Sequence, residues 1–341
     1  MASYLRNDPK VQIRELKDDS IKFSLSNTDT SVANALRRVM ISEVVTIAID
    51  RVEVLQNSSP LTDEFLCHRL GLIPLSYNYT EQNVGICSGH AVEDFGTLEH
   101  RFQDTTECEC NGGCYKCSAI FELKVKFEQS DDANEVTKNV TSRDLEPIEV
   151  VQHPDVQPVH FSSQDEKENS HDEGILIVKL ARGQEVWMRC TAILGIAKQH
   201  AKWSPVSACS FMCKTIVIPN MAAYNLLTPD EQAEIRSVCR EPHIFDGTHA
   251  GGAVDVENTK DWLFTGELEE KCREITGKYD HSLVSISRDE TSFIFNVETT
   301  GAMPPYEVVH EALKKINSKM RSLKEEIQRE MADPMNNSNL G

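Results

Sequence analysis

The feature that most constrains the fold is a long amphipathic segment near the C-terminal end of the sequence. Pro304 and Pro305 precede it and Pro334 follows it, so we expect one helix over about residues 305–331. At about 1.5 Å per residue, such a helix is roughly 40 Å long. Its apolar residues recur at alternating spacings of four and three: Val309, Leu313, Ile316, Met320, Leu323 and Ile327. This heptad seam, with Lys and Glu on the other faces, predicts that the helix packs against another surface.

Two kinds of surface could cover the seam: a sheet of the same chain or a helix of a partner, and the pattern alone favours neither. Alternating apolar residues over 10–25 predict a hairpin, and β-branched residues over about 44–54 predict a third strand. Between them, N-cap residues at 27–29 precede a helical stripe. The apolar positions of this stripe are Val32, Leu36, Val39 and Met40. The chain is therefore predicted to be of the α+β class.

The middle of the sequence predicts further short elements. A helix is expected at 61–70, and strands are expected at 120–127, 175–180, 185–194, 282–287 and 293–297, the last two as a pair. Two polar stretches, 128–144 and 162–174, predict surface loops. Such segments bury too little apolar area to offset the entropy lost on ordering.

Four cysteines within ten residues form the second motif: Cys108, Cys110, Cys114 and Cys117. Zinc takes four thiolates in a tetrahedron, and the Cys-x2-Cys spacing at the end of the motif is a common half-site. Gly112 and Gly113 lie between the halves, where a tight reversal of the backbone favours glycine. We therefore expect one structural zinc ion with no open position for catalysis. A redox dithiol and an iron–sulfur cluster stay open as alternatives.

The charge of the chain limits its function. Formal net charge is -19, whereas a protein that neutralises several phosphates needs a basic face, so we expect little or no direct DNA contact. One basic and aromatic cluster could touch phosphate or a base, although a loop that faces another protein explains it equally well. Its members are Lys198, His200, Lys202 and Trp203. Phosphate-binding loops, nucleophile elbows and dense aspartate runs are not found, so the sequence does not support catalysis.

The sequence also indicates a cellular compartment. No stretch approaches the roughly 18 apolar residues of a membrane span. The first residues lack the apolar region of a secretory signal. Eleven cysteines without such a signal indicate a reducing compartment, which is the cytosol or the nucleus.

Three blocks of sequence resemble a known family. ANALRRV at 33–39, followed by ISEV at 41–44, is one block, and DEFLCHRLGLIPL at 63–75 is another. The third is GIAKQHAKWSPV at 195–206. Together they resemble the α-subunit family of RNA polymerases, in its bacterial, archaeal and eukaryotic forms. Residues 214–275 depart from the family's pattern.

The resemblance implies a domain organisation and a function. A dimerisation domain in two pieces, 1–50 and 184–341, with an antiparallel sheet and long helices, would be interrupted by a mainly β insert domain at 51–183 that carries the cysteine loop. The chain would be a scaffold without catalytic residues. It would pair with a smaller α-like subunit, and the pair would then bind the second-largest subunit and small zinc-binding subunits of the polymerase.

The resemblance also implies roles for single residues. The implied dimerisation residues are Leu36, Val39, Met40, Val309, Leu313, Ile316, Met320, Leu323 and Ile327. Other implied subunit contacts are Arg37, Arg38, Lys198, His200, Lys202 and Trp203. The cysteine loop is similar to that of the RNA polymerase II branch, which implies mRNA transcription in the nucleus. A zinc- or thiol-dependent enzyme, and the equivalent subunit of another nuclear polymerase, are the alternatives.

Overall fold

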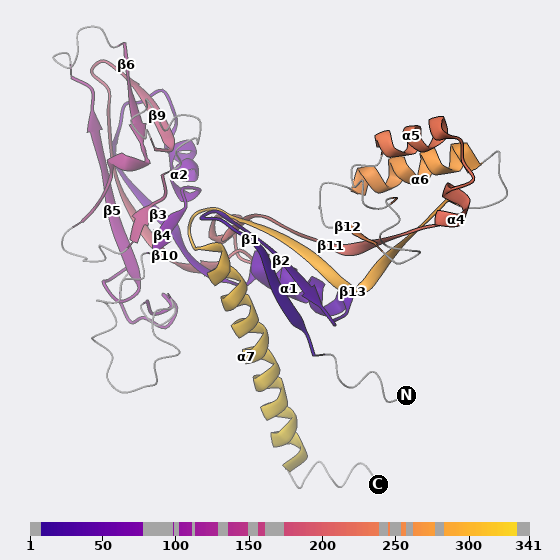
Figure 1. Ribbon diagram of the computed structural model, residues 1–341. Coiled ribbons are helices and arrows are strands. Elements are labelled where there is room, and N and C mark those ends of the chain that lie inside the picture. Colours follow the sequence, from indigo (N-terminus) through magenta and orange to yellow (C-terminus); the bar gives the residue numbers. More distant parts are fainter. Residues whose placement is uncertain are drawn as a thin grey trace. The chain divides into compact units, whose positions relative to one another are not determined.

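The fold comes from a computed structural model (Figure 1). It describes residues 8–77, 98, 102–110, 113–128, 136–148, 156–160, 174–238, 245, 254–256, 262–276 and 283–332. The chain divides into two compact units. The first unit comprises Met1–Arg37 and Cys209–Val297, and the second comprises Arg38–Ala208 and Glu298–Gly341. The predicted two-piece domain around an insert at 51–183 stays a prediction.

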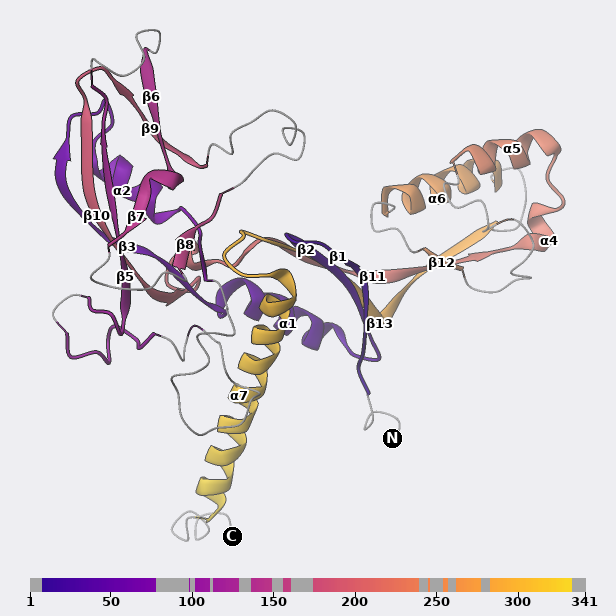
Figure 2. The same cartoon turned by 60° about the vertical axis from the view of Figure 1, so that its left-hand side comes forward.

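The first unit is built on a five-stranded sheet with the strand order β1-β2-β13-β11-β12. These strands are β1 (Lys10–Leu16), β2 (Ser20–Ser26), β11 (Val206–Pro219), β12 (Val254–Val256) and β13 (Val284–Thr299). β1 and β2 form the predicted antiparallel hairpin. Figure 2 shows them side by side, with β11 and β13 running on past them toward the helices within residues 221–276.

The prediction of two paired strands at 282–287 and 293–297 was wrong. β13 is one continuous strand of 16 residues. The polar residues in its middle lie mostly exposed along the strand. Thr28 donates its backbone N–H to the carbonyl oxygen of Thr291 at 3.2 Å there. Farther along, the Phe295 ring stacks on Phe23 of β2 at 4.8 Å between centroids, which joins the two strands in the core.

The helix after the hairpin, α1 (Thr30–Ser42), begins where the sequence predicts. The Asp29 carboxylate accepts the backbone N–H groups of Ser31 and Val32 at 2.8 and 3.1 Å, which is an N-cap. Its buried stripe consists of Ala33, Leu36, Val39 and Met40. Val32 lies at the edge of this stripe and is largely exposed.

The segment that departs from the family's pattern has a hydrophobic core of its own. It contains α4 (Met221–Tyr224), α5 (Pro229–Val238) and α6 (Trp262–Thr276). Tyr224 stacks on Phe245 at 4.6 Å, and its hydroxyl accepts a hydrogen bond from Arg236. Ile235 of α5 and Leu268 of α6 are fully buried in the same cluster.

The second unit contains a four-stranded sheet with the order β3-β10-β5-β7. These strands are β3 (Val45–Asn57), β5 (Ser118–Lys126), β7 (Leu145–Pro147) and β10 (Glu185–Ile196). β10 runs antiparallel to both neighbours, with Ile196 opposite Val45 and Ile193 opposite Ser118. The starts of β3 and β5 and the end of β10 therefore meet at one end of the sheet. The helix α2 (Asp63–Gly71) lies beside this sheet and contacts β3 (Figure 1).

Two small ribbons complete the second unit. β4 (Leu75–Tyr77) pairs with β8 (Val156–Pro158), and β6 (Thr137–Thr141) pairs with β9 (Leu176–Ala181). Because β6 and a 3-10 turn at Ser142–Asp144 occupy part of 128–144, the loop predicted there was wrong for these residues. A single fully buried side chain, Val140, anchors β6 despite its polar neighbours. The other predicted loop, 162–174, lies outside the described residues except for Gly174.

All strand pairs whose register is described are antiparallel, and helices accompany both large sheets, so the α+β class is confirmed. The last helix, α7 (Pro305–Ala332), confirms the helix predicted at 305–331. Among the described residues, no helix combines the length and the apolar character needed to cross a membrane.

A close contact in the second unit predicts a steric effect. A Cβ at Gly195 would lie 2.3 Å from the Trp203 ring, so we expect Gly195→Ala to lower the free energy of unfolding by about 1–3 kcal/mol. Urea denaturation followed by tryptophan fluorescence measures this. Gly266→Ala is the control, because nothing lies within 4 Å of a Cβ there. An unchanged urea midpoint for Gly195→Ala would contradict the packing of Trp203.

Candidate metal centre and dimerisation surface

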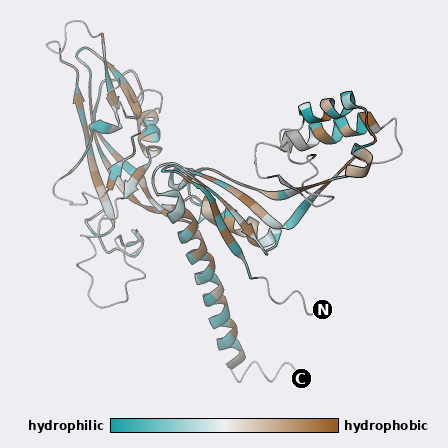
Figure 3. Ribbon diagram, viewed as in Figure 1, coloured by the Kyte–Doolittle hydropathy of each residue, from teal (hydrophilic) through white to brown (hydrophobic). Residues whose placement is uncertain are grey.

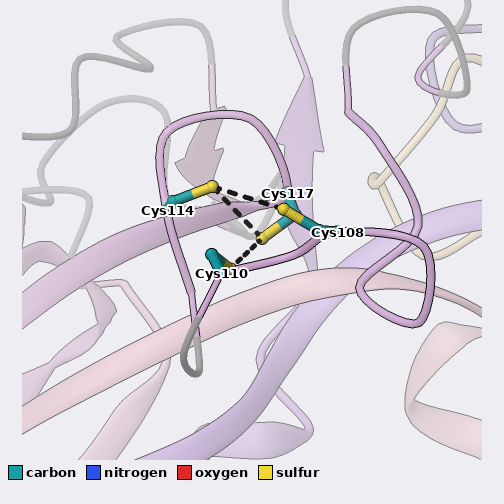
Figure 4. A group of neighbouring side chains, drawn as sticks. All are labelled: Cys108, Cys110, Cys114 and Cys117. Atoms are coloured by element: carbon teal, nitrogen blue, oxygen red, sulfur yellow. Dashed lines mark hydrogen bonds between the residues drawn. The ribbon is translucent and has the colours of Figure 1, made fainter.

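The four clustered cysteines point their sulfur atoms toward one another (Figure 4). The Sγ–Sγ distances are 3.6 Å between Cys108 and Cys114, 3.5 Å between Cys110 and Cys117, and 3.7 Å between Cys114 and Cys117. All four sulfur atoms lie within 4.8 Å of one another. A disulfide bond would need about 2.05 Å, so these are free thiols. The structure therefore brings together the four residues that the sequence singled out, and they could hold one metal ion.

The first half of the loop is shaped by a local turn. One carboxylate oxygen of Asp104 accepts from both the backbone N–H and the hydroxyl of Thr106, each at 2.8 Å. These bonds hold the pKa of Asp104 below its usual value. The carbonyl oxygen of Asp104 accepts the backbone N–H of Cys108 at 3.1 Å. The turn thus fixes the backbone at the first ligand.

The second half is a tight knuckle at the start of β5. The carbonyl oxygen of Cys114 accepts the backbone N–H groups of Cys117 and Ser118 at 3.1 and 2.9 Å. Gln103 donates its backbone N–H to the carbonyl oxygen of Lys116 at 2.8 Å, which joins the two halves. Because Ser118 is the first residue of β5, the knuckle is attached directly to the four-stranded sheet.

Gly113 allows the loop to approach this sheet. Its φ is +135°, a conformation that L side chains rarely adopt. A Cβ there would lie 3.0 Å from Ser118 Oγ and 3.3 Å from Thr191 Cγ2, which belong to β5 and β10. The prediction that the glycine pair serves a tight reversal is confirmed for Gly113, whereas Gly112 lies outside the described residues.

The cysteine environments differ in polarity. The backbone N–H of Lys116 stabilises the thiolate of Cys114 and lowers its pKa to about 7. Burial raises the pKa of Cys117 to about 12, and this side chain is fully covered. A buried thiolate needs a cation beside it, and a metal ion that deprotonates the thiol supplies that charge. Four sulfur ligands fill a tetrahedron and leave no position for substrate.

The heptad seam of α7 is largely uncovered. Leu313, Met320, Leu323 and Ile327 are 47, 58, 56 and 52% exposed. Val309 and Ile316 are half-buried. Figure 3 shows α7 as a mainly hydrophilic helix with hydrophobic residues between the hydrophilic ones. A row of large apolar side chains left in water is typical of a binding surface.

A different face of α7 packs on the chain itself. Val308 and Ala312 are fully buried, and Lys319 forms an ion pair with Glu43. This face lies about 100° around the helix from the seam, because each residue turns the helix by that angle. The helix is thus held by one stripe while its neighbouring stripe is free for another molecule.

The three predicted dimerisation residues of α1 lie in another environment. Leu36, Val39 and Met40 are 3, 8 and 0% exposed, so this chain already covers them. Between Leu36 and Val39, the Arg37 guanidinium donates to Asn34 Oδ1 at 2.9 Å, and Arg38 is exposed. The role of these residues in dimerisation or subunit contact stays a prediction.

Residues of the basic and aromatic cluster make their contacts with other residues of the second unit. Lys202 Nζ lies 2.6 Å from Asp50 and 4.3 Å from the centre of the Trp203 ring. Trp203 is 6% exposed and donates its indole N–H to the carbonyl oxygen of Ile193 at 3.2 Å, so its ring is not open to a nucleic-acid base. His200 Nδ1 accepts the backbone N–H of Lys202 at 3.1 Å.

Nothing in the sequence indicated that Glu43 forms a long-range ion pair. Its carboxylate pairs with Lys319, which lies 276 residues away, and it is 3.7 Å from Lys198. No local spacing in the sequence could have indicated this pairing.

Comparison with known proteins identifies the family. Residues 22–320 match the family described as RNA polymerase Rpb3/Rpb11 dimerisation domain. The chain belongs to this family, which confirms the resemblance found in the sequence.

Individual relatives extend over nearly the whole chain. The Arabidopsis thaliana protein named DNA-directed RNA polymerases II, IV and V subunit 3 is 39% identical over 93% of this chain and 90% of its own length. The Dictyostelium discoideum DNA-directed RNA polymerase II subunit rpb3 is 37% identical over 98% of both chains. The mouse DNA-directed RNA polymerases I and III subunit RPAC1 is 30% identical over 93% of this chain and 84% of its own length.

The geometry of the cysteine cluster predicts the effect of removing one ligand. Cys114→Ser should reduce the bound metal from about one ion per chain to nearly none, because a neutral hydroxyl replaces a thiolate. Metal analysis of the purified chain measures this. Cys213→Ser, at a half-buried cysteine of β11, is the matched control and should keep its metal. Full metal content in Cys114→Ser would refute the ligand assignment.

Proposed function

We propose that this chain is a non-catalytic assembly subunit of DNA-directed RNA polymerase II that pairs with a smaller α-like subunit. The observation that carries the proposal is the uncovered heptad seam on α7, in a chain that belongs to a dimerisation family. The relatives named as RNA polymerase II subunit 3 are 37–39% identical, whereas the mouse relative of polymerases I and III is 30% identical. This difference favours the RNA polymerase II branch over the subunit shared by polymerases I and III.

The seam supplies the driving force for pairing. Full burial of a large apolar side chain contributes roughly 1.5–3 kcal/mol, so a seam residue that is about half exposed gains about half of this when a partner covers it. Part of this gain offsets the entropy lost when two chains associate. The residues that a partner would cover are Val309, Leu313, Ile316, Met320, Leu323 and Ile327, with Met331 beyond them, 71% exposed. Heptad spacing suits a second helix that lies along the first.

The distances between the cysteines support zinc as the metal. Four sulfur atoms around zinc at about 2.3 Å have S–S separations of about 3.8 Å. The separations of 3.5–3.7 Å in three of the cysteine pairs are close to this value. An iron–sulfur cluster places several iron and sulfide atoms between its cysteines and needs a wider cage. The zinc loop would be structural, since its four thiolates complete the coordination.

The remaining parts of the proposal concern the assembled enzyme. The heterodimer would next bind the second-largest subunit and small zinc-binding subunits, in the nucleus. Arg38, Lys198 and His200 are candidates for these contacts because their side chains are exposed. A net charge of -19 supports a place away from DNA, where the chain makes little or no direct contact with it.

The competing proposal, a thiol-dependent enzyme, makes a different prediction for the cysteines. A catalytic thiol must be accessible, whereas four zinc-bound thiolates resist alkylation until a chelator removes the metal. Alkylation with mass-spectrometric readout should therefore leave Cys108, Cys110, Cys114 and Cys117 unmodified before chelation and modify them afterwards. Rapid alkylation of one of them in the metal-loaded chain would favour the enzyme.

A charge placed in the seam should abolish pairing. Leu313→Asp or Leu323→Asp would bury an unpaired carboxylate in the interface, which we expect to weaken binding of the smaller α-like subunit by roughly a hundredfold or more. Co-purification and titration measure the loss. Ser318→Asp is the control, because Ser318 is an exposed residue of α7 outside the heptad positions. Pairing that survives Leu313→Asp would exclude the seam as the interface.

The most informative experiment on the whole proposal is a tagged purification from nuclear extract. The expected result is a stoichiometric complex with a smaller α-like subunit and the large polymerase subunits, with zinc measured in the pure heterodimer. A well-folded chain that is recovered alone and never pairs on co-expression would contradict the proposal.

A further inference from the structure

Glu43 lies between α1 and β3, where one carboxylate joins two other elements. Its backbone N–H donates to the carbonyl oxygen of Val39 at 3.0 Å and continues the last turn of α1. One carboxylate oxygen binds Lys319 of α7, and the other lies 3.7 Å from Lys198 Nζ. The Glu43 side chain is only 14% exposed, whereas Lys319 and Lys198 are 50 and 68% exposed. The Glu43 carboxylate is therefore the most buried of these three charged groups.

The contact with Lys319 falls at the middle of α7. Val308 and Ala312, in the first turns of the helix, are fully buried. The large exposed residues of the seam start at Leu313. Lys319 comes directly before Met320 in the seam, so the pair lies beside the surface that a partner would cover. The backbone N–H of Lys198 donates to the carbonyl oxygen of Ser42 at 3.1 Å. This bond holds the loop after β10 without the Glu43 side chain.

We infer that Glu43 is a positioning residue that fixes the direction of α7 for partner binding. The inference rests on the proposed function, because it assigns Glu43 a role in pairing through the seam. Glu43 makes no contact with the partner in this account. It acts through Lys319, which it holds against the end of α1.

The electrostatic interactions of Glu43 with the surrounding lysines support this role. The hydrogen bond from Lys319, followed by the charges of Lys319, Lys198 and Lys315, holds the pKa of Glu43 below its usual value. Without this carboxylate, Lys319 and Lys198 would lose the anion that they share. An exposed ion pair contributes little in water. A partner that covers Met320 also excludes water from the neighbouring pair, and the attraction then strengthens as the local dielectric constant falls.

The first test measures the affinity of the full chain for the smaller α-like subunit. Glu43→Gln should bind about fivefold more weakly at low salt. The difference should shrink at about 1 M salt, where the screening length is about 3 Å. Glu53→Gln is the matched control, since it removes an exposed carboxylate of the same unit that lies 4.0 Å from Arg189. It should bind like the wild type.

Hydrogen exchange of the free chain gives a second readout that needs no partner. Glu43→Gln should speed exchange up to about fivefold over residues 315–323 and leave 305–312 unchanged, because Val308 and Ala312 still hold the first turns. Lys319→Met should have the same effect, and the double variant should add little to either one. Lys319 is exposed enough for this variant to serve if Glu43→Gln fails to fold.

The outcomes separate this inference from the proposed function. Unchanged affinity and unchanged exchange in both Glu43→Gln and Lys319→Met would overturn the positioning role, even where Leu313→Asp abolishes pairing. A wild-type chain that does not pair would overturn the proposed function, and the positioning role in pairing would fall with it. Equal losses of affinity for Glu43→Gln and Glu53→Gln would show a general charge effect and would also overturn the role.

Discussion

The antiparallel pairing of β10 with β3 on one side and β5 on the other is the interaction on which both candidate sites depend. Its register brings the starts of β3 and β5 and the end of β10 to one end of the sheet. The cysteine loop leads directly into Ser118, the first residue of β5. Glu43 lies two residues before β3, and Lys198 lies two residues after β10. A slip of one residue would turn every side chain to the opposite face and would separate these groups.

The two stripes of α7 connect packing with function. Val308 and Ala312 attach the helix to its own chain, and Glu43 holds it farther along. These contacts matter because most of the stability of a helix in a protein comes from tertiary packing. The seam beside them remains available, so the free chain presents an ordered apolar surface. An ordered surface binds with a smaller entropic cost than one that must first become helical.

The parts of the structure that follow from local spacing could be predicted from the sequence. The heptad residues predicted α7, and the four close cysteines predicted one cluster of sulfur atoms. Apolar spacing on α1 predicted burial of Leu36 but could not show that the chain itself covers it. Trp203 suggested a ring that could touch a base, yet the ring is buried and lies against Gly195, a contact that no periodicity of the sequence indicates. The Glu43 pairing joins distant segments, so no local pattern encodes it.

The central claim is that a smaller α-like subunit covers the seam of α7. Hydrogen exchange of the full chain, measured with and without that subunit, tests this claim most directly. The account predicts that binding slows exchange over residues 313–331 of α7, since a covering helix protects these amides. A complex that forms while exchange over 313–331 stays unchanged would contradict the account and would place the interface on another surface.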